Sequence, residues 1–140
     1  MEESLNLLNG ITRTEHTAAD QYSPLTLAYL GDAVFELYVR ARLVGAADVQ
    51  ADKLHKRAIQ YVSAPAQAKM AAVIEPMLTE KEQKIYKRGR NGKPHSIAKN
   101  ASVSDYLKAT GFETLIGYLY LSGETGRLNE ILEKALEGGL

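Results

Sequence analysis

Two acidic residues, Asp32 and Glu113, stand where the sequence is otherwise apolar. Asp32 is preceded by Tyr-Leu-Gly and followed by Ala-Val-Phe, and Glu113 is preceded by Gly-Phe and followed by Thr-Leu-Ile-Gly-Tyr-Leu. Burying a carboxylate without a partner is strongly unfavourable, so each acid needs a counter-charge or a hydrogen-bond donor. Neither of these two segments contains a basic side chain that could supply one. The sequence therefore predicts two buried acids that require an outside partner.

Glycines next to the two acids predict that their segments pack closely together. Gly31 adjoins Asp32, and Gly117 lies one helical turn after Glu113. Glycine within a helix costs about 1 kcal/mol relative to alanine, a cost tolerated where two backbones must approach closely. Two close-packed helices that bring carboxylates together are typical of a site for Mg²⁺ or Mn²⁺, completed by water and phosphate. The alternative for either acid alone is an ordinary hydrogen-bonded or partly exposed carboxylate.

The patterns around these acids predict an all-α protein with a helical-bundle fold. Residues 25–44 are apolar on nearly every face, which is typical of a central buried helix. Ser23-Pro24 marks its start and Gly45 its stop. A second long apolar helix is expected from Ser102 or Ser104 to residue 121, ended by Ser122-Gly123.

Four shorter helices complete the expected fold. They are predicted over residues 48 or 49–61, 63–74, 79–88 and 127–136, and the third of them opens with a Thr-Glu-Lys-Glu capping box. Residues 89–101 are rich in glycine, asparagine and proline and are expected to form a loop. Residues 1–20 are expected to be a loosely ordered lead-in to a single domain over residues 21–140.

Composition excludes several classes of protein. A chain of 140 residues is long enough to bury one core, and it contains no cysteine. A disulfide scaffold, a thiolate zinc site and a cysteine nucleophile are therefore excluded. The amino-terminal segment lacks the basic start and long apolar run of a signal peptide, and no window approaches the ~18 apolar residues of a membrane span. We expect a cytoplasmic protein.

Two motifs resemble those of the ribonuclease III family. Residues 27–36, Leu-Ala-Tyr-Leu-Gly-Asp-Ala-Val-Phe-Glu, resemble the signature of its catalytic domain, which centres on Leu-Gly-Asp-Ala. Residues 112–121, Phe-Glu-Thr-Leu-Ile-Gly-Tyr-Leu-Tyr-Leu, resemble its second motif, Glu-Ala-Leu-Ile-Gly followed by an apolar run. Residues 87–91, Lys-Arg-Gly-Arg-Asn, and residues 94–100 are similar to the Mini-ribonuclease III branch. The resemblance covers residues 25–136.

The resemblance implies a ribonuclease III-type endonuclease domain that works as a homodimer. Such an enzyme cleaves double-stranded RNA with Mg²⁺, or Mn²⁺ in its place, and leaves 5′-phosphate and 3′-hydroxyl ends. The branch implies maturation of the precursor of large-subunit (23S) ribosomal RNA and the absence of a separate double-stranded-RNA-binding domain. By motif, Asp32 is the catalytic aspartate and Glu113 the essential glutamate, and both bind the metal.

This chain departs from the wider family at three acidic positions. Full-length enzymes carry acids seven and four residues before the aspartate, where this chain has Leu25 and Ala28. They also carry an aspartate three residues before the glutamate, where this chain has Thr110. Two carboxylates therefore stand where four are expected, which leaves open the number of metal ions. A role for Glu36, one turn after Asp32, is also left open.

Basic residues in the middle of the chain are the candidates for RNA binding. The net charge is zero, from 17 basic and 17 acidic residues, so only their distribution carries information. A-form RNA is recognised mainly through phosphates and 2′-hydroxyls, which suits cations and neutral donors near a glycine-containing loop. The first candidate set is Lys84, Lys87, Arg88, Arg90, Asn91, Lys93, His95, Lys99 and Asn100. A second set is Lys53, Lys56 and Arg57, with His55 beside them.

Two other functions compete with the nuclease. One is a non-catalytic double-stranded-RNA-binding or ribosome-associated protein that kept the fold, against which the retention of Asp32 and Glu113 argues. The other is a helical interaction module without a nucleic-acid partner, in which the basic segment is an ordinary solvated loop. Nuclease activity separates the first function from both alternatives.

Overall fold

The computed structural model describes residues 18–92 and 102–137, and these residues form helices without any strand. The α-helices are α2 (Pro24–Ala46), α3 (Ala51–Val62), α4 (Ala64–Ile74), α5 (Glu80–Arg90), α6 (Val103–Leu121) and α7 (Thr125–Ala135), and the 3-10 helices are η1 (Ala19–Gln21) and η2 (Glu75–Met77). The predicted all-α class is confirmed. Within the described residues, no helix is long and apolar enough to cross a membrane.

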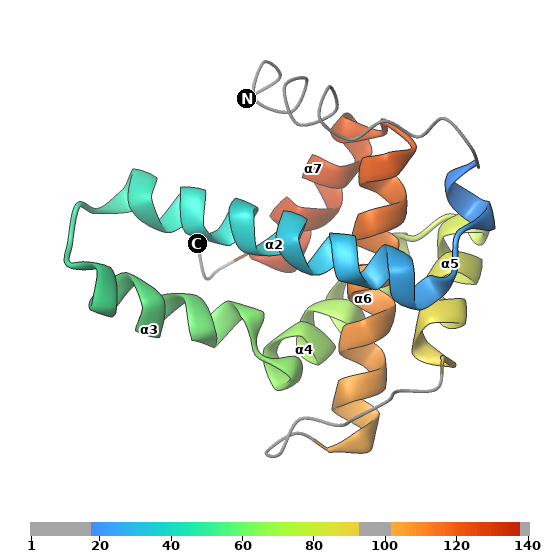
Figure 1. Ribbon diagram of the computed structural model, residues 1–140, viewed down its shortest axis with the longest axis horizontal. Helices are drawn as coiled ribbons and strands as arrows, with labels where there is room; N and C mark the ends of the chain where they lie inside the picture. Colours follow the sequence, from blue (N-terminus) through green and yellow to red (C-terminus); the bar gives the residue numbers. More distant parts are fainter. Residues whose placement is uncertain (1–17, 93–101, 138–140) are drawn as a thin grey trace.

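Helix α6 is the centre of the fold. Helices α2, α4, α5 and α7 all pack against it, whereas α3 packs against α2 and α4. Figure 1 shows α2 crossing α6 closer to the start of α2 than to its end, with α3 and α5 at opposite ends of the molecule. Nearly every residue from Ala109 to Tyr120 is buried, because neighbours surround α6 on several sides.

Aromatic and aliphatic side chains fill the space beside the crossing of α2 and α6. The rings of Phe35 and Phe112, both fully buried, meet edge to face with their centroids 5.2 Å apart. Leu27 and Leu115 belong to the same core and are fully buried as well. Edge-to-face rings add about 0.5–1.5 kcal/mol beyond the burial of their surface, so this pair fixes how the two helices are oriented.

The backbones of α2 and α6 touch where glycines replace side chains. A Cβ atom on Gly31 would overlap the carbonyl oxygen of Glu113, and a Cβ atom on Gly117 would overlap the carbonyl oxygen of Leu27. The close helix contact predicted from these two glycines is confirmed. A similar contact joins α5 to α6, because a Cβ atom on Gly89 would overlap the side chain of Thr114.

A buried ion pair connects α7 to the start of α5. Arg127 donates hydrogen bonds to both carboxylate oxygens of Glu82, at 2.9 and 2.8 Å, and to the carbonyl oxygen of Met77 at 2.7 Å. The Arg127 guanidinium holds the pKa of the Glu82 carboxyl below its usual range. Glu82 and Thr79 also form the predicted capping box. Both oxygens of the Glu82 carboxylate accept hydrogen bonds within the protein, so neither is free to bind a ligand.

Four predicted boundaries were wrong by a few residues. Helix α3 begins at Ala51, two or three residues later than predicted. Gly45 lies inside α2, which continues to residue 46, because its φ is not positive and glycine does not force a stop there. Gly89 and Arg90 lie in α5 rather than in the loop, since Gly89 packs against α6 and that contact continues the helix. Helix α7 begins at Thr125, two residues earlier than predicted.

The glycine contact at the helix crossing predicts unequal effects of two Gly→Ala changes on α2. Gly31→Ala should lower the free energy of unfolding by roughly 1–3 kcal/mol or more, because the new methyl group must push two backbones apart. Gly45→Ala should be neutral or stabilising by about 0.4–1 kcal/mol, since nothing lies within 4 Å of its added Cβ atom. Urea unfolding measures both values. Equal effects of the two changes would contradict the close contact.

Candidate active site

The two acids singled out by the sequence meet at the crossing of α2 and α6. Asp32 follows Gly31 on α2, and Glu113 supplies the backbone carbonyl against which Gly31 packs. The carboxyl groups lie close enough for a protonated Glu113 to donate a hydrogen bond to Asp32. The glycine contact therefore positions the pair, because it leaves no side chain between the two helices.

The environment of Glu113 opposes its ionisation. Burial is the largest of the causes that raise its pKa to about 9 from an ordinary value of 4.5. The hydrogen bond to Asp32 and the charge of Asp32 raise it further, and the more distant charge of Glu36 adds to them. The side-chain amide of Gln67 acts in the opposite direction. Two carboxyl groups that cannot both ionise easily mark a site that favours a shared positive ligand.

The expectation that both acids are buried in apolar cores was wrong for Asp32. The Asp32 residue is exposed, and Glu113 is only partly exposed. Helix α2 is buried along the side that faces α6 through Leu27, Gly31 and Phe35, whereas its outer side faces solvent. The pair thus joins one accessible carboxyl group to one enclosed group.

The donors at the site are oxygen atoms, as Mg²⁺ and Mn²⁺ prefer. Among the described residues, no group of three or more His, Cys, Asp or Glu side chains is arranged to hold a metal. Asp32 and Glu113 fit a hard cation because it would relieve the repulsion between them, with water and phosphate completing its coordination. Glu36 contributes negative charge nearby, but its carboxylate lies 3.6 Å from the Arg40 guanidinium.

The positions where the wider family carries further acids supply no ligand here. Ala28 is buried and apolar, and Leu25 is partly buried. The hydroxyl group of Thr110 donates a hydrogen bond to the carbonyl oxygen of Tyr106 at 3.0 Å. That hydroxyl group is committed to its own helix, so the pair remains a two-carboxylate site.

Gln67, on α4, is a site residue that the sequence analysis missed. Its side chain is 2% exposed and acts on the Glu113 carboxyl group. The available signal was a lone amide in a run that, apart from Lys69, is small and apolar: Ala64-Pro-Ala-Gln-Ala-Lys-Met-Ala-Ala-Val-Ile74. Such a residue on a buried helix points to a polar partner on a neighbouring helix.

The first set of RNA-binding candidates divides into residues with different surroundings. Lys84 and Lys87 are exposed on α5, and Lys84 lies 3.9 Å from Glu80 on the same helix. The Arg90 guanidinium lies over the ring of Tyr86, 5.8 Å from its centroid, and Asn91 caps the helix. Four further candidates, Lys93, His95, Lys99 and Asn100, lie outside the described residues.

Arg88 makes contacts that the sequence did not indicate. Its guanidinium donates hydrogen bonds to the carbonyl oxygens of Asp20 at 2.9 Å and Tyr22 at 3.2 Å. Lys81, two turns earlier on the same face of α5, forms an ion pair with Asp20 at 3.6 Å. Arg88 therefore holds the segment before α2 against α5, in addition to any contact that it makes with RNA.

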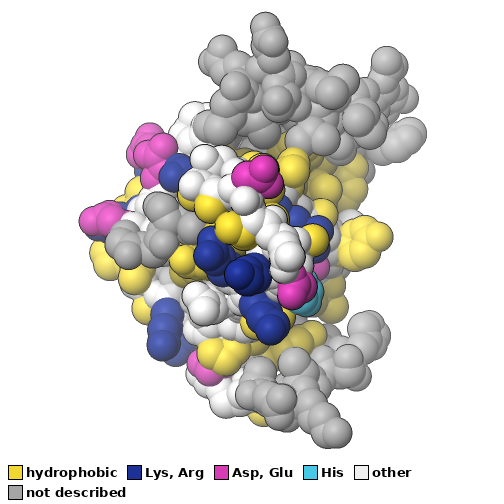
Figure 2. Space-filling view, turned by 90° about the vertical axis from the view of Figure 1, so that its left-hand side faces the viewer, with side chains coloured by type: hydrophobic (Ala, Val, Ile, Leu, Met, Phe, Trp, Pro, Cys, Tyr) yellow, Lys and Arg dark blue, Asp and Glu magenta, His cyan; other side chains and the backbone are white. Residues whose placement is uncertain are grey.

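The second set of RNA-binding candidates lies at the other end of the molecule. Lys53, Lys56 and Arg57 are exposed on α3, as is His55. Figure 2 looks at this end and shows Lys and Arg side chains gathered near a histidine. Because α3 and α5 lie at opposite ends in Figure 1, a single chain does not join the two basic sets into one patch.

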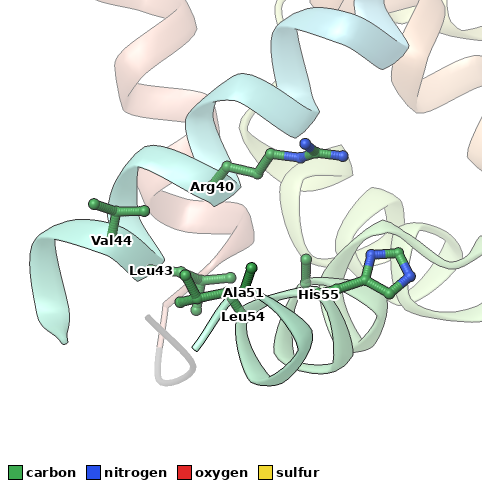
Figure 3. A pocket seen from close by; sticks show the side chains of 7 residues that line it. Arg40, Leu43, Val44, Ala51, Leu54 and His55 are labelled. Carbon is green, nitrogen blue, oxygen red and sulfur yellow. The ribbon is translucent and has the colours of Figure 1, made fainter. Parts of the chain in front are cut away.

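A hollow between α2 and α3 lies apart from the acidic pair. Its volume is about 240 Å³, and its lining consists of Arg40, Leu43, Val44, Ala51, Leu54, His55 and Ala58. Figure 3 shows aliphatic side chains at its floor with Arg40 and His55 at its edge. Neither Asp32 nor Glu113 contributes to it, so the hollow is not the place where the candidate chemistry occurs.

Comparison with known proteins agrees with this geometry. A model of the ribonuclease III domain matches residues 25–124, which include both acids. Proteins named Mini-ribonuclease 3 are similar to this chain. The one from Symbiobacterium thermophilum is 49% identical over 81% of this chain and 88% of that protein. The one from Clostridium tetani is 51% identical over 81% of this chain and 76% of that protein. The one from Streptococcus pneumoniae is 41% identical over 95% of this chain and 94% of that protein.

A solved structure shares the arrangement of helices. The X-ray crystal structure of a protein from Fusobacterium nucleatum superposes with a TM-score of 0.78 at 31% sequence identity. The superposition covers 86% of this chain and 96% of that one. The helix order and the α2–α6 crossing are therefore those of an experimentally observed fold.

The raised pKa of Glu113 predicts that stability depends on pH in metal-free buffer. Between pH 4.5 and about 9 the folded protein retains a proton that the unfolded chain has released, so stability falls as pH rises through this interval. Glu113→Gln removes the carboxyl group that titrates, so the variant should not lose stability from this group as pH rises. Its free energy of unfolding in EDTA should exceed that of the wild type by on the order of 1–3 kcal/mol at pH 8, with little gain at pH 5.

Urea unfolding at the two pH values measures this difference. Glu124→Gln, at an exposed acid in the turn after α6, is the matched control and should behave as the wild type. An equal gain for Glu113→Gln at both pH values would contradict the assignment, because it would come from packing rather than from ionisation.

Proposed function

The chain belongs to the ribonuclease III family and is an endoribonuclease, and we propose that Asp32 and Glu113 form its catalytic and metal-binding centre. Its substrate class is double-stranded RNA. The observation that carries the proposal is the meeting of the two carboxyl groups at the α2–α6 crossing, where burial and Asp32 together raise the pKa of Glu113. Such a pair is costly to fold and suits a divalent cation.

The two acids have different tasks in this proposal. Glu113, enclosed between helices, would hold the ion against the core, and Asp32, which faces solvent, would hold it from the side that is open to the phosphate backbone. When bound, Mg²⁺ or Mn²⁺ supplies positive charge that stabilises the developing charge on phosphate and acidifies a water molecule. Hydrolysis in this arrangement gives 5′-phosphate and 3′-hydroxyl ends. The paired Glu36 and Arg40 flank the site and set the charge around it.

We further propose that basic side chains on α3 and α5 hold the duplex. Lys53, Lys56 and Arg57 on α3, with Lys84 and Lys87 on α5, are exposed and can reach phosphates. The candidate residues Arg90 and Asn91, together with Arg88, extend the α5 set at the end of that helix. From the family resemblance of its motifs, we also propose a role in maturing the precursor of 23S ribosomal RNA in the cytoplasm.

A second copy of the chain is the proposed partner of the exposed face of α2. Tyr29, Leu37 and Val44 are 85%, 49% and 61% exposed, and with Ala33 they fall on one face of the helix. Val44 also lines the hollow between α2 and α3. An exposed apolar stripe of this length favours a protein contact, and the Glu36–Arg40 ion pair lies along it.

Cleavage of a long RNA duplex tests the catalytic assignment. Asp32→Asn and Glu113→Gln should each lower the rate in Mg²⁺ by roughly a hundredfold or more, while duplex binding persists. Glu133→Gln, at an exposed acid on α7, is the control and should cleave at the wild-type rate. Near-normal cleavage by either site variant would reject the assignment. Duplex binding without cleavage by the wild type in any divalent metal would favour a non-catalytic RNA-binding protein.

The dimer is tested by the molar mass in solution. The wild type should sediment at twice the chain mass of 15.4 kDa, and Leu37→Arg should sediment at the mass of one chain, because a charge in the stripe opposes its burial. Val73→Arg is the matched control, since Val73 is a comparably exposed aliphatic residue (46%) on α4. A monomeric wild type, or an unchanged mass for Leu37→Arg, would reject this interface.

A further inference from the structure

Gln67 is the exception among the buried polar side chains of the described residues. Glu82 bonds to Arg127 and Thr79, Thr110 donates to a backbone carbonyl, and the Thr114 hydroxyl lies 2.7 Å from the carbonyl oxygen of Thr110. The Nε2 atom of Gln67 is fully buried and has no hydrogen-bond partner. An unpaired amide donor inside a protein is costly, so its presence calls for a reason beyond packing.

The neighbours of Gln67 indicate what that reason is. Its helix, α4, packs against α6, and its amide is the neutral polar group that acts on the Glu113 carboxyl group. A methionine or leucine would fill the same space without a polar cost. A lysine or arginine would neutralise the two acids and compete with a cation. An amide donates a hydrogen bond without adding charge, so it can hold an ionised carboxylate and leave its negative charge available.

We propose that Gln67 is a positioning residue of the divalent-cation site, whose amide holds the Glu113 carboxylate beside that of Asp32. This inference rests on the proposed function of the two acids. Gln67 touches neither the substrate nor the solvent, because its side chain is 2% exposed. It acts through Glu113, in the way that residues behind a metal ligand orient that ligand.

Gln67→Met separates this role from a structural one. Methionine has nearly the shape of glutamine and removes only the amide, so the metal-free protein should unfold at the same or a higher temperature. Binding of Mn²⁺, measured by electron paramagnetic resonance without RNA, should weaken about tenfold or more. The Mg²⁺ concentration for half-maximal cleavage should rise in the same proportion, while KM for duplex RNA stays unchanged.

Gln67→Leu provides a second variant that also lacks the amide, and Met70→Leu provides the control. Met70 is buried on α4 one turn after Gln67, so its replacement perturbs packing of the same helix without removing a polar group. Met70→Leu should bind Mn²⁺ as the wild type does. Unchanged Mn²⁺ binding in a folded Gln67→Met or Gln67→Leu protein would overturn the proposal. Equal losses of thermal stability and Mn²⁺ binding in both variants would overturn it too, since they would show a packing role.

The behaviour of the wild type and of Asp32→Asn distinguishes a wrong role for Gln67 from a wrong assignment of the catalytic centre. Metal-dependent cleavage that is lost in Asp32→Asn but retained in Gln67→Met at low Mg²⁺ would leave the nuclease centre intact and reject the role of Gln67 alone. A wild type that neither binds Mn²⁺ nor cleaves duplex RNA would reject the centre itself, and the role of Gln67 with it.

Discussion

The direct contact between the backbones of α2 and α6 is the constraint on which the rest of the structure depends. Gly31 and Gly117 allow the two helices to touch, and any side chain at either position would force them apart. Asp32 and Glu113 lie beside this contact, so the spacing of the acids is set by rigid backbone rather than by loops. Close-packed interiors resist small changes in volume, which keeps the distance between the acids fixed.

That rigidity brings together charges that repel each other. The fold tolerates a carboxyl group with a pKa of about 9 because apolar contacts elsewhere, such as that of Phe35 with Phe112, stabilise the same helix pair. Buried polar groups away from the site are satisfied by the protein itself, as the ion pair of Glu82 with Arg127 is. The unpaired amide of Gln67 and the raised pKa of Glu113 both occur at the acidic pair, where stability is given up for function.

The outer face of α2 connects this centre with the proposed partners. Asp32 is also exposed, and it lies about one turn after Tyr29 on α2. A second copy bound along this stripe would lie next to the acids. The two basic sets lie at opposite ends of one chain, so a duplex that contacts both must extend across the molecule. Charge distribution, rather than net charge, therefore governs how this protein meets RNA.

The sequence by itself determined the all-helical class, the two central helices, and the meeting of Asp32 with Glu113. These follow from helical periodicity, capping residues and glycines beside acids, which are local signals. Only the tertiary structure decided that Asp32 is exposed, that Gln67 faces Glu113 and that Arg88 holds the segment before α2. An apolar helix face looks the same in sequence whether it meets the core or solvent. Contacts between residues far apart in the chain depend on which helices meet, and only at Gly31 and Gly117 did a local pattern indicate such a contact.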